Sequence, residues 1–339
     1  MHTKHPIRII LTVILVFLLL VIAVFIYKLT TIPRASLGSI PVNDIAASSR
    51  ETMDDYWNIV LFGVDSRTGL IKSKTRTDSI MLASINKKTG KVKLTSIYRD
   101  TLVYIDADHG YTKLNAAYAY GGPEKALTVI NQNLDLNVQD FITVNFNSLA
   151  AIVDVLGGVK IDIQEDEIKQ VNNYTRDVAK ILGTKKVKIT EPGYQTLNGT
   201  QAVAYCRVRY TSGGDFRRTE RQRTVLQAII KGLKFAGPVK LLQIANKVFP
   251  EIYTSLSTIQ ILKLASKVLF MKLGTTDGFP YDTNAAYYKK VSYVFAEKTL
   301  ADNVVALHQK LFGIDNYKAT ANVKKYSAKI RAMDDSSTK

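Results

Sequence analysis

The sequence predicts an α/β fold in which a central mixed β-sheet is flanked by helices, as an α-β-α sandwich, and preceded by a single N-terminal transmembrane helix. One observation behind this prediction is that short apolar runs bounded by turn residues alternate with longer segments of helical periodicity. Another is an uncharged run near the N-terminus. The composition, 46% hydrophobic and 22% charged, is ordinary for a globular chain and excludes a disordered or collagen-like one.

The predicted transmembrane helix covers residues 9–27, which are 19 successive uncharged residues. Such a run is long enough to cross a hydrocarbon core of about 30 Å. The alternative is a cleaved signal peptide, but its apolar region would be only about 7–15 residues long, and no small-residue cleavage site follows here. We therefore expect an uncleaved anchor after a cytoplasmic tail over 1–8. Lysine and arginine are nearly balanced across the run, so charge alone leaves its orientation open.

The remaining chain divides into a stalk over 28–55, one domain over 56–315 and a flexible, charged tail over 316–339. Short apolar runs bounded by turn residues predict the strands of that domain. They lie at 57–64, 79–85, 91–98, 102–105, 141–146 and 159–163. The polar, glycine-containing segment 86–90 predicts a hairpin loop between the second and third strands.

Helices are predicted from apolar periodicity and from their capping residues. Pro123 at a first helical position and Asn147 as an N-cap mark two of the starts. A polar segment over 165–182 is either a helix or an irregular excursion. The predicted helices lie at 123–134, 147–155, 198–205, 216–235, 239–248, 259–270 and 300–312.

The charge and the rare residue types restrict the chemistry. With 46 Lys and Arg against 29 Asp and Glu, the net charge of +17 indicates an anionic partner: nucleic acid, lipid head groups or phosphate. The lone cysteine, Cys206, cannot form an internal disulfide or a multi-cysteine metal site. The sequence contains no G-x-S-x-G, H-E-x-x-H or Walker A motif, which argues against hydrolysis by an activated serine or by zinc.

Arginines are the most informative residues. Six of the 14 lie between 207 and 223, namely Arg207, Arg209, Arg217, Arg218, Arg221 and Arg223. Arg207 and Arg209 would share one face of an extended segment. Asp215 is a candidate N-cap, which would put Arg218 and Gln222 on one face of the next helix, near an N-terminus that favours anions. The alternative is a solvated amphipathic helix whose core face is Val225, Leu226, Ile229, Ile230 and Leu233.

Two aspartates lie at the ends of predicted strands. Asp65 follows the first strand, Asp78 precedes the second, and Arg99 and Asp100 follow the third. A pair of carboxylates with phosphate oxygens is a usual way of holding Mg²⁺. The alternative is that one aspartate caps a turn and the other pairs with Arg67 or Arg76.

These segments together resemble the LytR-CpsA-Psr family. The resemblance extends over about 55–225 in the family's order, with departures at Tyr98, Arg217 and Arg223. Its segments are 58–67 (NIVLFGVDSR), 76–78 (RTD), 94–101 (LTSIYRDT), 113–122 (KLNAAYAYGG), 153–159 (VDVLGGV), 197–209 (LNGTQAVAYCRVR) and 214–222 (GDFRRTERQ).

The resemblance implies a membrane-anchored, extracytoplasmic phosphotransferase. Such proteins move an anionic glycopolymer, wall teichoic acid or capsular polysaccharide, from a polyprenyl-pyrophosphate carrier to peptidoglycan. It implies that Asp65 and Asp78 associate with Mg²⁺ (or Mn²⁺) and that Asp65, Asp78, Arg99 and Arg207 are catalytic. The implied pyrophosphate-binding residues are Arg99, Lys113, Arg207, Arg209, Arg218 and Gln222.

Two other functions compete with this prediction. A non-catalytic binder of lipid-linked or anionic wall polymer would use the same arginines. A nucleic-acid-binding regulator would suit the charge, but the sequence has no helix-turn-helix, RRM or zinc pattern, so we expect no nucleic-acid partner. Helices 239–248 and 259–270 could line a cavity for the lipid tail, with ordinary core packing as the alternative.

Overall fold

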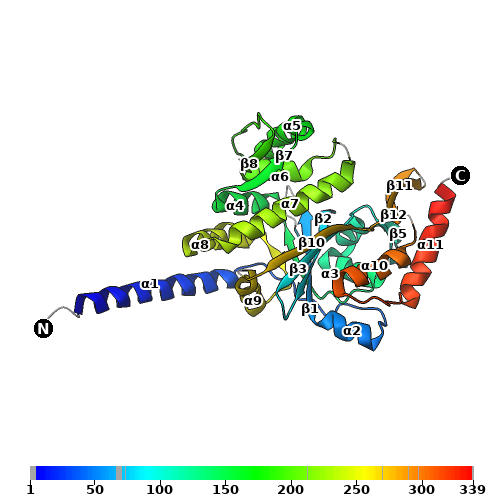
Figure 1. The fold of residues 1–339 in the computed structure, drawn as a ribbon, viewed down its shortest axis with the longest axis horizontal. Coiled ribbons are helices and arrows are strands. Elements are labelled where there is room, and N and C mark those ends of the chain that lie inside the picture. The colour runs from blue at the N-terminus through cyan, green and yellow to red at the C-terminus, as the bar shows by residue number, and fades with distance from the viewer. Residues whose placement is uncertain are drawn as a thin grey trace.

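A computed structural model describes residues 5–65, 71–72, 74–211, 213–268, 270–288, 290–296 and 298–337. Its central feature is a six-stranded mixed sheet of strand order β10-β3-β2-β1-β6-β9 (Figure 1). Strand β1 runs antiparallel to β2 and parallel to β6, and β10 runs parallel to β3. The strands are β1 Tyr56–Val64, β2 Thr77–Asn86, β3 Lys91–Ile97, β6 Asp140–Val144, β9 Tyr253–Thr254 and β10 Lys272–Phe279. The predicted mixed α/β sheet is therefore confirmed.

Among the described residues, three two-stranded antiparallel sheets lie outside this central sheet. They are β4 Leu102–Asp106 with β5 Gly110–Lys113, β7 Val159–Ile163 with β8 Gly193–Leu197, and β11 Thr283–Tyr288 with β12 Val291–Ala296. The strands at 102–105 and 159–163 were predicted from the sequence, but their partners were not. No strand was predicted at β10 either, where Gly274 and Gly278 interrupt the apolar pattern.

Helices cover both faces of the sheet. The helices of the described chain are α1 His5–Thr30, α2 Ala47–Asp54, α3 Leu114–Leu134, α4 Phe146–Leu156, α5 Glu165–Leu182, α6 Gly199–Arg207, α7 Gly214–Lys234, α8 Pro238–Lys247, α9 Thr258–Val268, α10 Leu300–Phe312 and α11 Ala321–Ser337, with a 3₁₀ turn, η1, at Phe249–Glu251. The predicted start at Pro123 is the second half of α3, which is kinked at Gly121 and Gly122. Helix α4 starts one residue after Asn145, which caps it in place of the expected Asn147.

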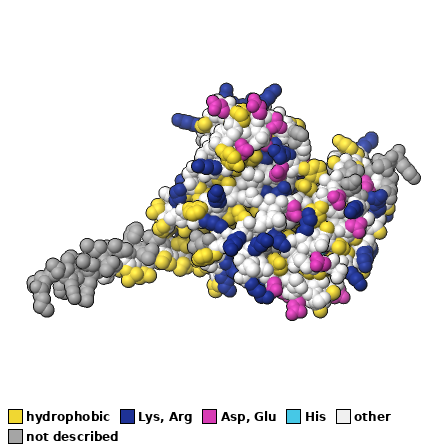
Figure 2. Space-filling view, viewed as in Figure 1, with side chains coloured by type: hydrophobic (Ala, Val, Ile, Leu, Met, Phe, Trp, Pro, Cys, Tyr) yellow, Lys and Arg dark blue, Asp and Glu magenta, His cyan; other side chains and the backbone are white. Residues whose placement is uncertain are grey.

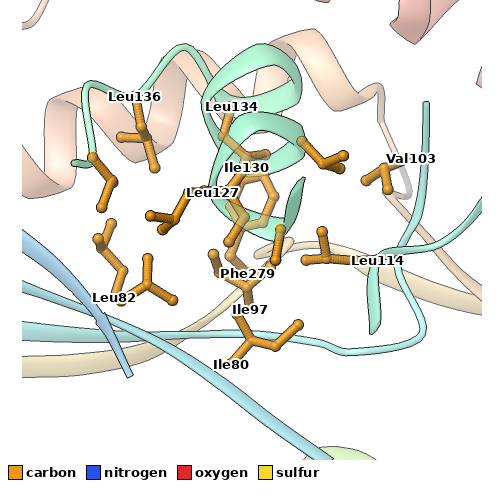
Figure 3. Packing of buried hydrophobic residues seen from close by; sticks show 14 of the residues in the cluster. Ile80, Leu82, Ile97, Val103, Leu114, Leu127, Ile130, Leu134, Leu136 and Phe279 are labelled. Carbon is orange, nitrogen blue, oxygen red and sulfur yellow. The ribbon is translucent and has the colours of Figure 1, made fainter. Parts of the chain in front are cut away.

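The main core lies between the sheet and α3. Leu127, Ile130 and Leu134 of α3 point toward the sheet (Figure 3). They meet Ile80, Leu82, Ile97 and Phe279 from β2, β3 and β10. A second core joins α4, α5, α6, β7 and β8 to one side of α7, and forms the lobe at the top of Figure 1.

Two predictions about the ends of the chain are wrong. Within the expected stalk, Ile40, Ile45 and Met53 are buried in the main core. Within the expected flexible tail, residues 321–337 form α11, where Val323 and Ile330 are buried against that same core. In both segments only a few apolar side chains are buried, so the sequence shows no strong period there.

Residues 9–27 lie within helix α1, which extends away from the rest of the molecule (Figure 1). Over the part of the chain that the structure describes, no helix combines the length and the apolar character required to cross a membrane. The predicted transmembrane helix is therefore not confirmed. Residues 1–4 of the predicted cytoplasmic tail lie outside the described residues.

Candidate active site

Three of the predicted site residues meet at one edge of the sheet because of its antiparallel register. Asp65 directly follows β1, and Val64 of that strand pairs with Thr77, next to Asp78 in β2. Arg99 lies two residues beyond the end of β3, which pairs antiparallel with β2. One guanidinium nitrogen of Arg99 donates to Oδ1 of Asp78. Strand direction alone therefore brings the end of β1, the start of β2 and the end of β3 together.

The chain from α6 to α7 adds the other arginines. Arg207 is the last residue of α6, and its Nη2 lies 3.7 Å from Oδ2 of Asp65. Nη2 of Arg209 lies 3.7 Å from Oδ1 of Asp78. Arg207 and Arg209 do not lie in one extended strand as expected, because Arg207 ends a helix. Both nevertheless reach the same site.

Helix α7 contributes Arg218 and Gln222 from one face, as predicted. Arg218 Nη2 donates to the backbone oxygen of Asp78 at 3.3 Å, and Gln222 Nε2 donates to the backbone oxygen of Cys206 at 3.3 Å. Burial lowers the pKa of the Arg218 guanidinium to about 10, while Asp215 opposes that shift. Arg218 therefore stays charged at neutral pH even though its side chain is only 2% exposed.

Asp215 has a different role from the predicted one. Gly213, with φ of 82°, occupies the N-cap position of α7, where an L side chain would be strained, and Asp215 lies in the first turn. Its carboxylate lies 3.0 Å from Arg218 Nη2 and 3.8 Å from Nε of both Arg99 and Arg209. The part of Asp215 as a third carboxylate of the arginine cluster was not predicted, although its place among the arginines in the sequence was a signal.

Lys113 lies at the edge of the site, beside Asp100, which was not predicted to belong to it. Lys113 Nζ is 3.4 Å from Oδ2 of Asp100, whose Oδ1 is 3.8 Å from Arg99 Nε. Asp100 thus connects Lys113 to Arg99. The ammonium group contacts the cluster through a carboxylate, and Lys113 is absent from the cavity lining described below.

Two aromatic rings support Arg207. Its Cζ lies 4.9 Å from the ring centre of Phe146 and 5.8 Å from that of Tyr174. Rings at this distance hold a guanidinium plane through cation–π attraction. Phe146 and Tyr174 come from α4 and α5, so no local sequence signal connects them to Arg207.

Three buried guanidinium nitrogens at the site have no hydrogen-bond partner among the described residues, namely Nε of Arg99, Nη1 of Arg207 and Nε of Arg218. A buried donor without an acceptor is costly, by about 1–3 kcal/mol. Guanidinium groups pair well with phosphate oxygens. The unsatisfied donors therefore indicate that an oxyanion belongs at this point.

A cavity of about 610 Å³ opens from this charged cluster. Asp65, Asp78, Arg207, Arg209, Arg218 and Gln222 line its polar end. Apolar residues of β1–β3, α7 and α9 line the rest, among them Leu61, Ile85, Leu94, Leu226, Ile230 and Val268. The apolar face of α7, expected to be core, borders this cavity. Of the two helices expected to line it, α9 does and α8 does not.

Comparison with known proteins decides the family. The model of the LytR_cpsA_psr family matches residues 32–310, most of the chain. This chain belongs to the LytR_cpsA_psr family.

Two curated relatives are similar over much of this chain. Polyisoprenyl-teichoic acid–peptidoglycan teichoic acid transferase TagT of Bacillus subtilis is 29% identical over 257 residues, which are 70% of this chain and 73% of TagT. Biofilm regulatory protein A of Streptococcus mutans is 31% identical over 238 residues, which are 66% of this chain and 56% of that protein. For several curated relatives the match thus spans only about half of their length.

A solved structure described as the LytR-CPS2A-psr family protein YwtF (TagT) with bound octaprenyl pyrophosphate lipid has the same fold. It is 25% identical, with a TM-score of 0.58, and the comparison covers 82% of this chain and all of that one.

The other three arginines of the 207–223 segment are not part of the cluster. Arg221 pairs with Glu167 at 2.7 Å in the interior, where both side chains are at most 2% exposed. Arg217 pairs with Glu220 at the surface. Arg223 is half-buried; burial lowers the pKa of its guanidinium, and Tyr98 is the main group that opposes this shift.

The two candidate metal ligands fit a metal held jointly with a substrate. No cluster of three or more His, Cys, Asp or Glu side chains suited to a metal occurs among the residues described. Asp65 and Asp78 nevertheless both line the polar end of the cavity, and Mg²⁺ is commonly bound by one or two carboxylates together with phosphate oxygens. Arg67, the other candidate partner of the aspartates, lies outside the described residues.

Proposed function

We propose that this protein transfers an anionic glycopolymer, wall teichoic acid or capsular polysaccharide, from a polyprenyl-pyrophosphate carrier to peptidoglycan. The observation that carries the proposal is the cavity with one charged and one apolar end. A polyprenyl pyrophosphate has that same division of charge. The name of TagT as a teichoic acid transferase supports the glycopolymer as the transferred group. The octaprenyl pyrophosphate in its solved complex supports the polyprenyl-pyrophosphate carrier.

The arginines bind the pyrophosphate in this proposal. Arg99, Arg207, Arg209 and Arg218 now pair with Asp65, Asp78 and Asp215. An entering pyrophosphate supplies further acceptors for them, first of all for the unsatisfied nitrogens of Arg99, Arg207 and Arg218. Lys113 adds positive charge at the edge, and Gln222 is a neutral donor. Donors fixed in this way stabilise the charge that develops on the phosphate oxygens.

The reaction breaks one phosphoanhydride bond and forms one phosphodiester bond. A hydroxyl of peptidoglycan attacks the phosphorus next to the glycopolymer, and polyprenyl phosphate leaves. One of the two carboxylates, Asp65 or Asp78, accepts the hydroxyl proton. Asp65 and Asp78 would also hold Mg²⁺, or Mn²⁺ in its place, which neutralises phosphate charge when bound. Water in place of the sugar hydroxyl would give a pyrophosphatase side reaction.

The proposal includes a location at the cell membrane. Helix α1 anchors the chain as a single span, and the domain that follows is extracytoplasmic, where peptidoglycan is assembled. The 19 uncharged residues at 9–27 and the resemblance of the domain to cell-wall transferases support this arrangement. A reporter that is active only in the cytoplasm, fused after Lys339, tests this location. Activity of the fusion would contradict it.

A turnover assay with purified full chain, a lipid-linked donor and a peptidoglycan acceptor tests the function. We expect polyprenyl phosphate to be released and the polymer to become attached to peptidoglycan. Tight binding of the donor without release of polyprenyl phosphate would instead indicate a non-catalytic binder, which the same arginines would serve.

A further inference from the structure

Large apolar side chains are exposed at the end of the molecule from which α1 extends. Phe235 is 83% exposed, Phe270 79%, Val239 69% and Ile259 66%. Phe235 follows α7, Phe270 precedes β10, and Val239 and Ile259 lie in α8 and α9. Isolated exposed apolar residues are common, but a group that includes two nearly uncovered phenylalanines indicates an interaction surface.

Helix α9 is part of the same surface. It has no buried residue among those described. One side, with Leu264 and Val268, lines the apolar end of the cavity, whereas Ile259 and Leu262 are exposed to solvent. An amphipathic helix that keeps an apolar side uncovered is typical of helices that lie in a membrane interface.

The charge around these residues is strongly positive. Between residues 231 and 272 there are seven lysines and one acidic residue, Glu251. Glu251 already accepts a hydrogen bond from Asn145 at 2.9 Å. Figure 2 shows hydrophobic side chains next to Lys and Arg at this end of the molecule. Lysines that surround exposed aromatic residues match the anionic head groups and the interface of a bilayer.

Two contacts connect this surface to its surroundings. Arg34, just after α1, donates to Thr258 Oγ1 at the start of α9 at 3.0 Å, so the surface adjoins the end of α1. Lys234, next to Phe235, donates to the backbone oxygen of Met271, which follows Phe270 and lines the cavity. The two phenylalanines thus flank the apolar end of the cavity.

We infer that Phe235, Val239, Ile259, Phe270 and the surrounding lysines form a surface that inserts into an anionic bilayer and delivers the polyprenyl chain to the apolar end of the cavity beside α9. The part that concerns lipid delivery rests on the proposed function. Bilayer contact itself does not depend on that function. The occupant of this surface is a lipid bilayer, and a protein partner in its place would overturn the inference.

Membrane contact is tested with full chain reconstituted in phosphatidylcholine–phosphatidylglycerol vesicles. Phe270→Cys and Val239→Cys variants carry an environment-sensitive fluorophore, and Tyr287→Cys in β11, 69% exposed at the other end of the molecule, is the matched control. The native Cys206 is buried, so it should label poorly. We expect lipids with nitroxide-labelled acyl chains to quench the fluorophore at 270 and 239 but not at 287. Equal quenching at all three positions, or none at 270 and 239, would overturn the inference.

Lipid delivery is tested with the Phe235→Ser/Phe270→Ser double variant. Removing two phenylalanines from the interface should raise KM for a donor embedded in vesicles by about tenfold, with kcat unchanged. The KM for a short-chain donor in free solution should stay the same, and Phe235→Trp/Phe270→Trp should behave like wild type. An unchanged KM for the vesicle donor would refute delivery through this surface. If the wild type turns over neither donor, the proposed function fails, while the quenching experiment still decides the membrane contact.

Discussion

Arg221 and Glu167 form an ion pair in the interior, with 2.7 Å between Nε and Oε1 and side chains that are 2% and 1% exposed. The guanidinium also donates to the backbone oxygen of Val208 at 3.1 Å and to Thr211 Oγ1 at 2.6 Å. This pair therefore attaches the chain between α6 and α7, which carries Arg209, to α5. Three residues earlier on the same helix, Arg218 serves the candidate site.

The first prediction concerns that buried pair. Glu167→Ala should lower the free energy of unfolding by about 3–5 kcal/mol, because it leaves the Arg221 charge buried without its carboxylate partner. Glu220→Ala is the matched control, since it breaks the exposed pair with Arg217 and should cost less than about 1 kcal/mol. Urea unfolding of the two variants measures the difference. Equal losses would show that burial does not decide the strength of these pairs.

Arg99→Ala and Arg207→Ala should each reduce transfer by at least about 10²–10³-fold, because each removes donors from the phosphate site. Near-UV circular dichroism should stay that of the wild type. Arg207→Lys should restore little, since an ammonium group cannot reproduce the guanidinium fork that lies against Phe146. Release of polyprenyl phosphate at the wild-type rate by either alanine variant would contradict the assignment.

Removal of the divalent metal should stop turnover. We expect EDTA to abolish release of polyprenyl phosphate and added Mg²⁺ or Mn²⁺ to restore it. Asp65→Asn and Asp78→Asn should weaken Mg²⁺ binding in calorimetry with a non-hydrolysable pyrophosphate present. Undiminished turnover in EDTA would exclude an essential metal.

Ile230→Trp should fill part of the apolar end of the cavity. For donors with long polyprenyl chains, KM should rise by about tenfold or more, because a chain that cannot enter loses the burial of several CH₂ groups. Donors with a very short chain should be turned over normally, which separates blocked entry from damage to the arginine cluster. Equal effects on both donors would argue against the cavity as the lipid site.

The stability of the fold should depend on His308 below neutral pH. This side chain is buried, its ring stacks on Tyr317 with 3.6 Å between centres, and burial lowers its pKa from 6.5 to about 4. Between pH 6.5 and pH 4 the unfolded chain binds more protons than the folded one. The His308 contribution to the free energy of unfolding is therefore fully present above pH 6.5. It falls by up to about 3 kcal/mol as the pH drops toward 4. Urea unfolding of wild type and His308→Gln over pH 4–7 measures this. The variant should lose this part of the pH dependence of the free energy of unfolding. An identical pH dependence in wild type and variant would refute the role of His308.

Most of the central sheet could be predicted because its strands carry their own signal. β1, β2 and β3 are apolar runs between turn residues, and their antiparallel order brings Asp65, Asp78 and Arg99 to one edge. Strand β10 could not be predicted in this way, since it pairs with β3 through backbone hydrogen bonds and carries few apolar residues. The two ends of the domain were also missed, because α2 and α11 each bury only a few side chains.

For the site, residue types and spacing predicted most of the residues that the structure brings together around the charged end of the cavity. The sequence by itself determined that aspartates follow or precede strands, that arginines gather at 207–223 and that Arg218 and Gln222 share a helical face. Only the tertiary structure separated Arg207, Arg209 and Arg218, which reach the cavity, from Arg221, which is buried against Glu167. The physical reason is that α7 has the lobe on one side and the cavity on the other, so the partner of each arginine depends on residues far away in the sequence. The same holds for Leu226 and Ile230, since periodicity reveals an apolar face but not whether side chains or a cavity lie opposite it.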